Sequence, residues 1–246
     1  MFAPLQGFFL PFRALPSLLK PGIRPFVLIP LSLNIAIFVL LAWAAVSYFD
    51  LFMAQYLPED TWLGFLRPIL WLVFALAYAL AMFYGFTILA NLIASPFNGI
   101  LAAKVEEQLT GSLPAGANLS VMASIGPAIT GELGKIAYFL KWAIPILLLF
   151  LVASFIPGLN LLVTILWVTF GFWFLALEYA DYPMGNYDLA PREQRNRLAR
   201  RRFKSLGFGA GVSAMMLVLD FLAMPAAVVG ATRLWVEDLK GLSSNG

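Results

Sequence analysis

The sequence predicts an all-helical integral membrane protein, on the evidence of its composition and of where its charges fall. Of the 246 residues, 61% are hydrophobic and 12% are charged, whereas soluble domains have about 45–50% apolar and about 25% charged residues. A soluble core of this size cannot bury so large an apolar share. We expect one helical membrane domain over residues 1–246. It should hold two long transmembrane helices, two re-entrant helical pairs that penetrate only partly, and an N-terminal amphipathic interfacial helix.

Two residue types are missing, and their absence excludes most enzyme classes. The chain contains no cysteine and no histidine, which excludes disulfides, thiolate or imidazole metal sites, cysteine nucleophiles and Ser-His-Asp catalysis. No other nucleophile–base pair is visible, so we expect neither an enzyme nor a metal or cofactor site. The net charge of only +3 also gives no reason to expect a nucleic-acid partner.

The first segment, residues 1–20, is predicted to be an amphipathic helix that lies in the membrane interface. Its apolar residues recur at helical spacing and are interrupted by polar ones such as Gln6 and Arg13. Pro11 and Pro16 should kink or break this helix. An unstructured N-terminal tail is the alternative.

Two uncharged runs are long enough to cross a bilayer. Residues 25–49 and 68–91 carry no charge, and at 1.5 Å per residue each spans a hydrocarbon core of about 30 Å. We expect the chain to break at Ser95-Pro96, where a separate short helix should begin. Residues 96–141 are then a cytoplasmic region of helix and loop.

Two later apolar runs are cut into short pieces. Pro157-Gly158 divides residues 142–177 into 15 and 19 residues, and Asp220 divides residues 205–232 into 15 and 12. A 15-residue helix reaches about 22 Å, which is short of a full crossing. We therefore expect re-entrant helical pairs, whose irregular ends must be covered by an oligomer or line a cavity. With a cytoplasmic N-terminus, 15 of the 16 Lys and Arg lie inside, although full crossings would give the same count.

The strongest candidate for anion binding is the turn before the first spanning helix. Gly22 permits a tight turn, Pro25 suits a first helical residue, and Arg24 adds a guanidinium. A helix N-terminus has free N–H groups and partial positive charge, so it can hold sulfate or phosphate. The alternative is a basic residue that anchors the helix end at the headgroups.

Polar residues within the apolar segments form the second group of candidates. A half-helix that begins at Ser95 could face an anion at membrane depth, or it could be a simple turn at the end of a span. An Asp or Glu among apolar residues is costly unless it is paired or solvated, and Glu178 and Asp181 are also such residues. The candidates for a polar path are Asn34, Asn91, Asn98, Glu106, Glu107 and Asp220. For an anion path, we expect basic residues to neutralise Glu106 and Glu107.

The remaining patterns have mainly structural interpretations. The basic run Arg192–Lys204 could concentrate anions at a cytoplasmic mouth, or it could be a topology signal that touches anionic lipid. Gly207-Phe-Gly-Ala-Gly211 fits the small-residue spacing that permits close helix packing. Residues 110–131, rich in Gly, Pro, Ser and Ala, are expected to form a loop, and Glu132 stands where a P-loop would need lysine.

Four segments together resemble the CysZ family of bacterial inner-membrane sulfate transporters. They are Pro-Gly-Ile-Arg-Pro-Phe-Val at 21–27, Ala-Ser-Pro-Phe-Asn-Gly at 94–99, Glu-Tyr-Ala-Asp-Tyr-Pro-Met at 178–184, and residues 225–235. The resemblance implies sulfate uptake for cysteine synthesis. It also implies an all-helical fold of two long spanning helices and helical pairs that penetrate the membrane only partly. It further implies homo-oligomers, either dimers or higher assemblies such as a hexamer built from dimers. Carried over by position, the sulfate site is Gly22, Ile23 and Arg24, with Pro25 where many members have a second basic residue.

The sequence thus supports a sulfate channel or ion-coupled carrier in the bacterial inner membrane, with sulfate and the lipid bilayer as its partners. The alternative is a non-transporting membrane scaffold or an accessory subunit, which would have no continuous polar path.

Overall fold

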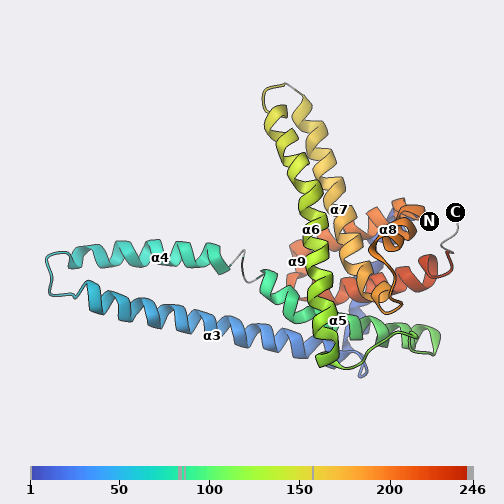
Figure 1. Cartoon of the computed structure of the whole chain (residues 1–246), viewed down its shortest axis with the longest axis horizontal. Coiled ribbons are helices and arrows are strands. Elements are labelled where there is room, and N and C mark those ends of the chain that lie inside the picture. Colours follow the sequence, from blue (N-terminus) through green and yellow to red (C-terminus); the bar gives the residue numbers. More distant parts are fainter. Residues whose placement is uncertain (1, 83–84, 86, 157, 243–246) are drawn as a thin grey trace. The chain divides into compact units, whose positions relative to one another are not determined.

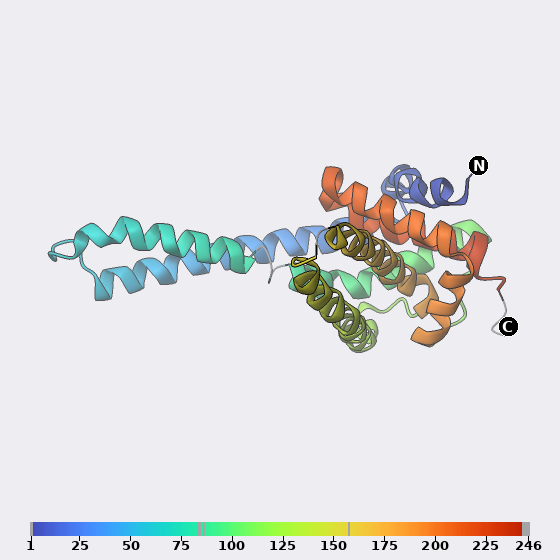
Figure 2. The ribbon, with the colours of Figure 1, turned by 90° about the horizontal axis from the view of Figure 1, so that it is seen from above.

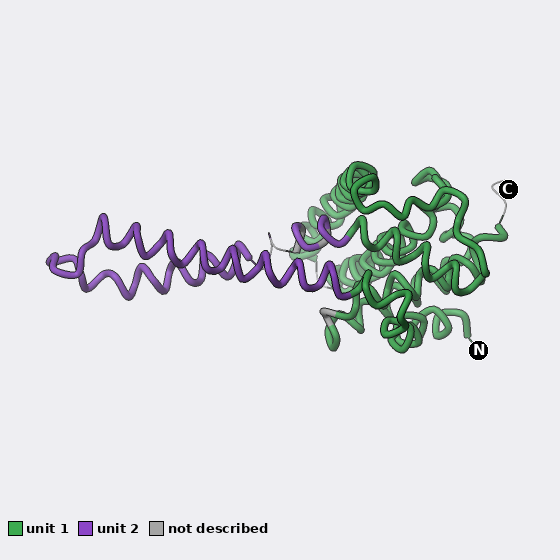
Figure 3. The backbone as a smooth tube through the Cα atoms, turned by 90° about the horizontal axis from the view of Figure 1, so that it is seen from below, with its two compact units in different colours: residues 1–27, 95–246 green, residues 28–94 purple. Residues whose placement is uncertain are grey.

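The computed structural model describes residues 2–82, 85, 87–156 and 158–242, and all regular structure in these residues is helical (Figure 1). This confirms the predicted all-α class. The α-helices are α1 (Ala3–Phe8), α2 (Leu10–Ala14), α3 (Arg24–Tyr56), α4 (Arg67–Ala81), α5 (Thr87–Thr110), α6 (Val121–Ala153), α7 (Leu159–Gly185), α8 (Pro191–Arg200) and α9 (Arg202–Leu234), followed by a π-helix over Trp235–Leu239. The chain forms two units, residues 28–94 and residues 1–27 with 95–246 (Figure 3).

Unit 2, residues 28–94, is built on a pairing of α3 with α4. The ring of Phe49 on α3 stacks on Phe74 of α4 at 4.0 Å between centroids and meets Trp71 edge-on at 4.7 Å. Arg67 at the start of α4 forms a 3.0 Å ion pair with Glu59 in the connection. Most of the large apolar side chains of this pair are exposed. Such a surface is unfavourable in water but compatible with the acyl chains of a bilayer.

Unit 1 contains a long antiparallel pair, α6 and α7, which meet at the turn before Gly158 (Figure 1). Gly158 has a φ of 84°, a left-handed conformation that glycine adopts without steric cost. The aromatic rings of Phe139 on α6 and Phe174 on α7 lie 4.8 Å apart. The pair is thus joined by side-chain packing along its length as well as by the turn.

The helices α3, α6 and α7 are longer than the uncharged runs from which we estimated them, whereas α4 has 15 residues and is shorter than the run 68–91. The helix α6 has 33 residues and α7 has 27, because α6 continues through charged positions that find partners in the fold. Among the residues that the structure describes, five helices are long and apolar enough to cross a membrane, by length and composition. Helix length therefore does not force residues 142–177 to re-enter, and the re-entrant arrangement stays a prediction.

Two expected irregular segments are helical instead. The chain does not break at Ser95-Pro96, because α5 runs through both residues and Ser95 donates its hydroxyl to Glu132 rather than capping a new helix. The expected loop over residues 110–131 ends early, at Ser120. The hydroxyl of Ser120 accepts the backbone N–H of Ala123 and so caps the start of α6.

The helix α9 turns back on itself beside Asp220. Leu219 has a non-helical backbone (φ −136°, ψ 51°). A Cβ atom placed on Gly230 would lie 3.2 Å from the ring of Phe208, which is impossible in a straight helix because 22 residues rise about 33 Å. Figure 2 shows the two halves, orange and red, lying against each other. The chain thus turns beside Asp220, the residue that divides the apolar run 205–232 in the sequence. How deeply this helical pair enters a membrane stays a prediction.

Glycines of α9 permit very close contact with its neighbours on two sides. A Cβ on Gly207 would lie 2.0 Å from the carbonyl oxygen of Pro4 on α1, and one on Gly209 would lie 1.8 Å from that of Phe172 on α7. These distances confirm the predicted role of the glycine spacing in close packing. The N-terminal helices are therefore fixed against α9, whose buried core includes Phe208, Val212 and Met215.

We predict that Gly209→Ala lowers the melting temperature in detergent, because its methyl group would displace the α7 backbone at a cost of about 1–3 kcal/mol. Gly134→Ala is the matched control, since no atom of a neighbouring element among the described residues lies within 4 Å of its Cβ position. It should be neutral or stabilising by up to about 1 kcal/mol. Equal melting temperatures for the two variants would contradict this packing.

Candidate functional site

The predicted anion-binding turn lies at the start of α3. The backbone N–H groups of Ile23 and Arg24 both donate to the carbonyl oxygen of Lys20, at 3.0 and 2.9 Å. Within the described part of the chain, the N–H of Gly22 makes no backbone hydrogen bond. Gly22 and Arg24 are exposed, whereas the Ile23 side chain is 1% exposed. The turn thus presents one free N–H and one guanidinium, while Ile23 anchors it in the core.

The helix α5 packs beneath this turn. The side chain of Ile23 shares a core with Leu101 and Val105 of α5. A Cβ placed on Gly22 would lie 3.3 Å from Nε2 of Gln108. A side chain at position 22 would therefore require the flexible end of Gln108 to shift by a few tenths of an ångström.

The two glutamates that follow on α5 are both paired with lysines. Glu106 is completely buried, and its Oε1 accepts hydrogen bonds from Tyr187 (2.5 Å) and from the Nζ of Lys240 (2.7 Å). Glu107 forms a 2.9 Å ion pair with Lys104. The expected neutralisation of both carboxylates is confirmed.

These contacts fix the protonation states around Glu106. Burial, together with its hydrogen bond to Glu106, raises the pKa of the Tyr187 hydroxyl. The hydrogen bond to Glu106 likewise raises the pKa of the Lys240 ammonium. Both groups therefore keep their protons at neutral pH, and the pair loses its positive partner only in alkaline solution.

The remaining polar-path candidates divide between the two units. Asn98 in unit 1 is 3% exposed, and its Nδ2 has no hydrogen-bond partner among the described residues. Asn34 in unit 2 likewise has a buried Oδ1 without a partner in that part of the chain. Asn91 and Asp220 lie on α5 and α9, but their side chains are outside what the structure describes.

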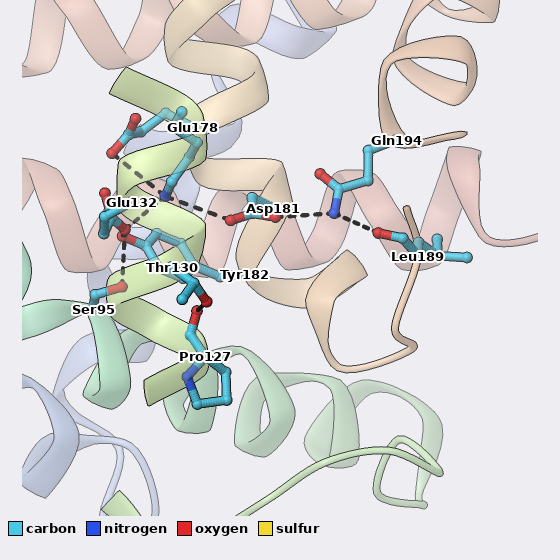
Figure 4. Close-up of polar contacts among 10 residues, drawn as sticks. Ser95, Pro127, Thr130, Glu132, Glu178, Asp181, Tyr182, Leu189 and Gln194 are labelled. Carbon is cyan, nitrogen blue, oxygen red and sulfur yellow. Dashed lines mark hydrogen bonds and ion pairs between the residues drawn. The ribbon is translucent and has the colours of Figure 1, made fainter. Parts of the chain in front are cut away.

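The most densely charged buried site surrounds Lys135 on α6 (Figure 4). Its Nζ lies 2.7 Å from Glu132 of the same helix, and 3.5 and 3.8 Å from Asp181 and Glu178 of α7. We call these four residues the Lys135 cluster. Three carboxylates face one ammonium here, so every one of them depends on Lys135 for compensation.

Neutral side chains connect the Lys135 cluster to two more helices. Ser95 of α5 donates to Glu132 at 2.8 Å, and Tyr182 of α7 donates to the same oxygen at 3.2 Å. Gln194 of α8 donates to Asp181 at 2.9 Å and to the carbonyl of Leu189 at 3.0 Å (Figure 4). The cluster therefore fastens α5, α6, α7 and α8 together.

Comparison with known proteins assigns the family. The model of the family "Sulfate transporter CysZ/Etoposide-induced protein 2.4" matches residues 10–225. The chain belongs to this family. It is 42% identical to the sulfate transporter CysZ of Pseudomonas fluorescens over 231 residues, covering 92% of this chain and 91% of the relative. It is 40% identical to that of Pseudomonas paraeruginosa (92% of each chain) and 38% identical to that of Pectobacterium atrosepticum (91% and 82%). The relatives are named as transporters, which agrees with the expectation of a non-enzyme.

Within this member of the CysZ family, the basic run after α7 is partly structural. Arg197 forms a 2.7 Å ion pair with Glu193, and Arg195 lies over the ring of Tyr138 at 5.0 Å. Lys204 forms an ion pair with Asp238. Several basic side chains thus hold α8 and the C-terminal segment in place in addition to any contact with lipid.

Sequence reasoning missed the Lys135 cluster. From the sequence, Glu132 is only the residue that breaks a P-loop spacing, and Lys135 lies in the region 96–141 that is predicted to be cytoplasmic. A usable signal was present: Glu132 and Lys135 are three residues apart, as are Glu178 and Asp181, so each pair shares a helix face. One lysine against three acids on neighbouring apolar helices should be paired.

We predict that Lys135→Met strongly destabilises the protein, by about 3–5 kcal/mol, because it leaves buried carboxylates uncompensated. Lys104→Met is the matched control, since it removes a partly exposed pair worth at most about 1 kcal/mol. Thermal unfolding in detergent measures both variants. If Lys135→Met melts at the temperature of the control, the Lys135 cluster does not hold the helices together.

Proposed function

We propose that this chain transports sulfate across the bacterial inner membrane and supplies it for cysteine synthesis. The observation that carries the proposal is the 38–42% identity, over more than nine-tenths of the chain, to relatives named sulfate transporter. The apolar helices support a multi-pass membrane location. A homo-oligomer, dimeric or higher, would cover the short helical pairs and surround a path for the ion.

Sulfate is bound first at the turn Gly22–Arg24. The free N–H of Gly22, the exposed Arg24 and the N-terminus of the 33-residue α3 support this site. Ile23 contributes through its anchorage in the core rather than through its side chain. With the N–H groups of Ile23 and Arg24 already donated to Lys20, the guanidinium makes the larger contribution.

From the turn, the anion passes the polar residues of the neighbouring helices. The pairing of Glu106 and Glu107 with lysines supports passage of a dianion, because neither carboxylate carries an uncompensated charge. The buried Nδ2 of Asn98 is a donor without an acceptor among the described residues. Such a group is suited to a transient hydrogen bond with an oxyanion.

Uptake of radiolabelled sulfate into proteoliposomes tests the function itself. Vesicles that contain the purified protein should accumulate more sulfate than empty vesicles, and an excess of unlabelled sulfate should compete. Folded protein that gives no uptake above empty vesicles would instead support the scaffold or accessory-subunit alternative.

We predict that Arg24→Ala weakens sulfate binding, measured by calorimetry, by about 10- to 100-fold, since a hydrogen bond to a charged group contributes about 1.5–3 kcal/mol. The control is Arg13→Ala, which removes another exposed arginine, from α2. An unchanged affinity of Arg24→Ala for sulfate would show that the turn Gly22–Arg24 is not the sulfate-binding site.

A further inference from the structure

We propose that Lys240, near the C-terminus, acts as the counter-charge that lets sulfate pass the buried carboxylate of Glu106. This inference rests on the proposed function and names a residue required for the same path. Lys240 lies 134 positions from Glu106 in the sequence, and it belongs to none of the segments that carry the family resemblance.

Glu106 depends on Lys240 for its charge balance. Among the described residues, Lys240 is the cation within ion-pair distance of this carboxylate, and Tyr187 supplies one neutral donor. The second carboxylate oxygen, Oε2, is buried and has no hydrogen-bond partner in the same part of the chain. Without Lys240, a fully buried carboxylate would thus retain a single hydrogen bond and no positive partner.

The C-terminal segment is fastened so that Lys240 reaches this carboxylate. Nη1 of Arg197 on α8 donates to the carbonyl oxygens of Leu239 and Lys240, at 3.1 and 3.2 Å. The same guanidinium lies over the ring of Trp235 at 5.3 Å. The Lys240 ammonium also lies 5.0 Å from the ring centre of Tyr187. These contacts fix both the backbone and the ammonium of Lys240.

The π-helix adds to this positioning. The N–H of Lys240 donates to the carbonyl oxygen of Trp235 at 2.8 Å, which is an i→i+5 bond that widens the last turn. The ion pair between Lys204 and Asp238 holds the same turn from the side of α9. The segment Trp235–Lys240 is therefore held by contacts to two helices.

The position of Glu106 explains why its charge matters to sulfate. It lies two residues before Gln108, whose amide is adjacent to Gly22 of the anion-binding turn, so it is about 3 Å along the axis of α5 from that contact, with its side chain on another face of the helix. A carboxylate in a low-dielectric interior repels a dianion far more strongly than one in water. Because Glu107 already pairs with Lys104, Lys240 completes the neutralisation of this part of α5.

The test uses the absence of cysteine from the chain, so that Lys240→Cys introduces a single thiol. The Lys240 side chain is 38% exposed and should be open to reagents. We expect Lys240→Cys to reduce sulfate uptake into proteoliposomes at least fivefold. Modification with an aminoethyl methanethiosulfonate, which restores an ammonium, should recover at least half of the uptake. The neutral methyl reagent should recover none.

The double variant Lys240→Cys/Glu106→Gln separates charge balance from folding. Without the carboxylate, unmodified Lys240→Cys should reduce uptake less than twofold relative to Glu106→Gln alone. Lys141→Cys, at an exposed lysine of α6, controls for the reagents. The proposal is overturned if Lys240→Cys transports normally, if both reagents act alike, or if Glu106→Gln does not relieve the loss. Absence of uptake by the unmodified wild-type protein would contradict the proposed function instead.

Discussion

The pairing of charges inside an apolar protein is the constraint on which this structure depends. An ion in a low-dielectric interior loses several kcal/mol of solvation free energy, and an oppositely charged partner with good hydrogen bonds must compensate that loss. In unit 1, Lys135 supplies this partner to carboxylates of α6 and α7, and hydrogen bonds from Ser95 and Gln194 to the same carboxylates connect α5 and α8 to them. The same contacts therefore hold these four helices together and compensate their buried charges.

The same constraint links the fold to the proposed transport of an anion. A path for sulfate tolerates carboxylates only where lysines neutralise them, as Lys104 and Lys240 do for Glu107 and Glu106. The predicted anion-binding turn lies beside this helix, because Gly22 is adjacent to Gln108 and Ile23 shares a buried core with Leu101 and Val105. Binding at the turn and charge balance on α5 thus depend on one packed region of unit 1.

The sequence predicted those features that composition and local spacing determine. The uncharged runs predict the helical membrane class. Asp220, a charged residue within an apolar run, predicts the division of α9, and the small residues at Gly207–Gly211 predict close helix packing. The pairing of Glu106 with some lysine also followed from electrostatics. Its partner could not be named, because nothing local relates α5 to Lys240. The uncharged run 142–177 stops before Glu178, whereas α7 continues to Gly185, because a charge that is paired, as Glu178 is with Lys135, need not end a helix.

A structure of the protein in a bilayer with bound selenate, a heavier analogue of sulfate, tests the account most directly. The account predicts selenate at the turn, in contact with the Gly22 N–H and the Arg24 guanidinium, with Lys240 hydrogen-bonded to Glu106 of α5. Selenate bound elsewhere, with this turn empty at a saturating concentration, would contradict the account.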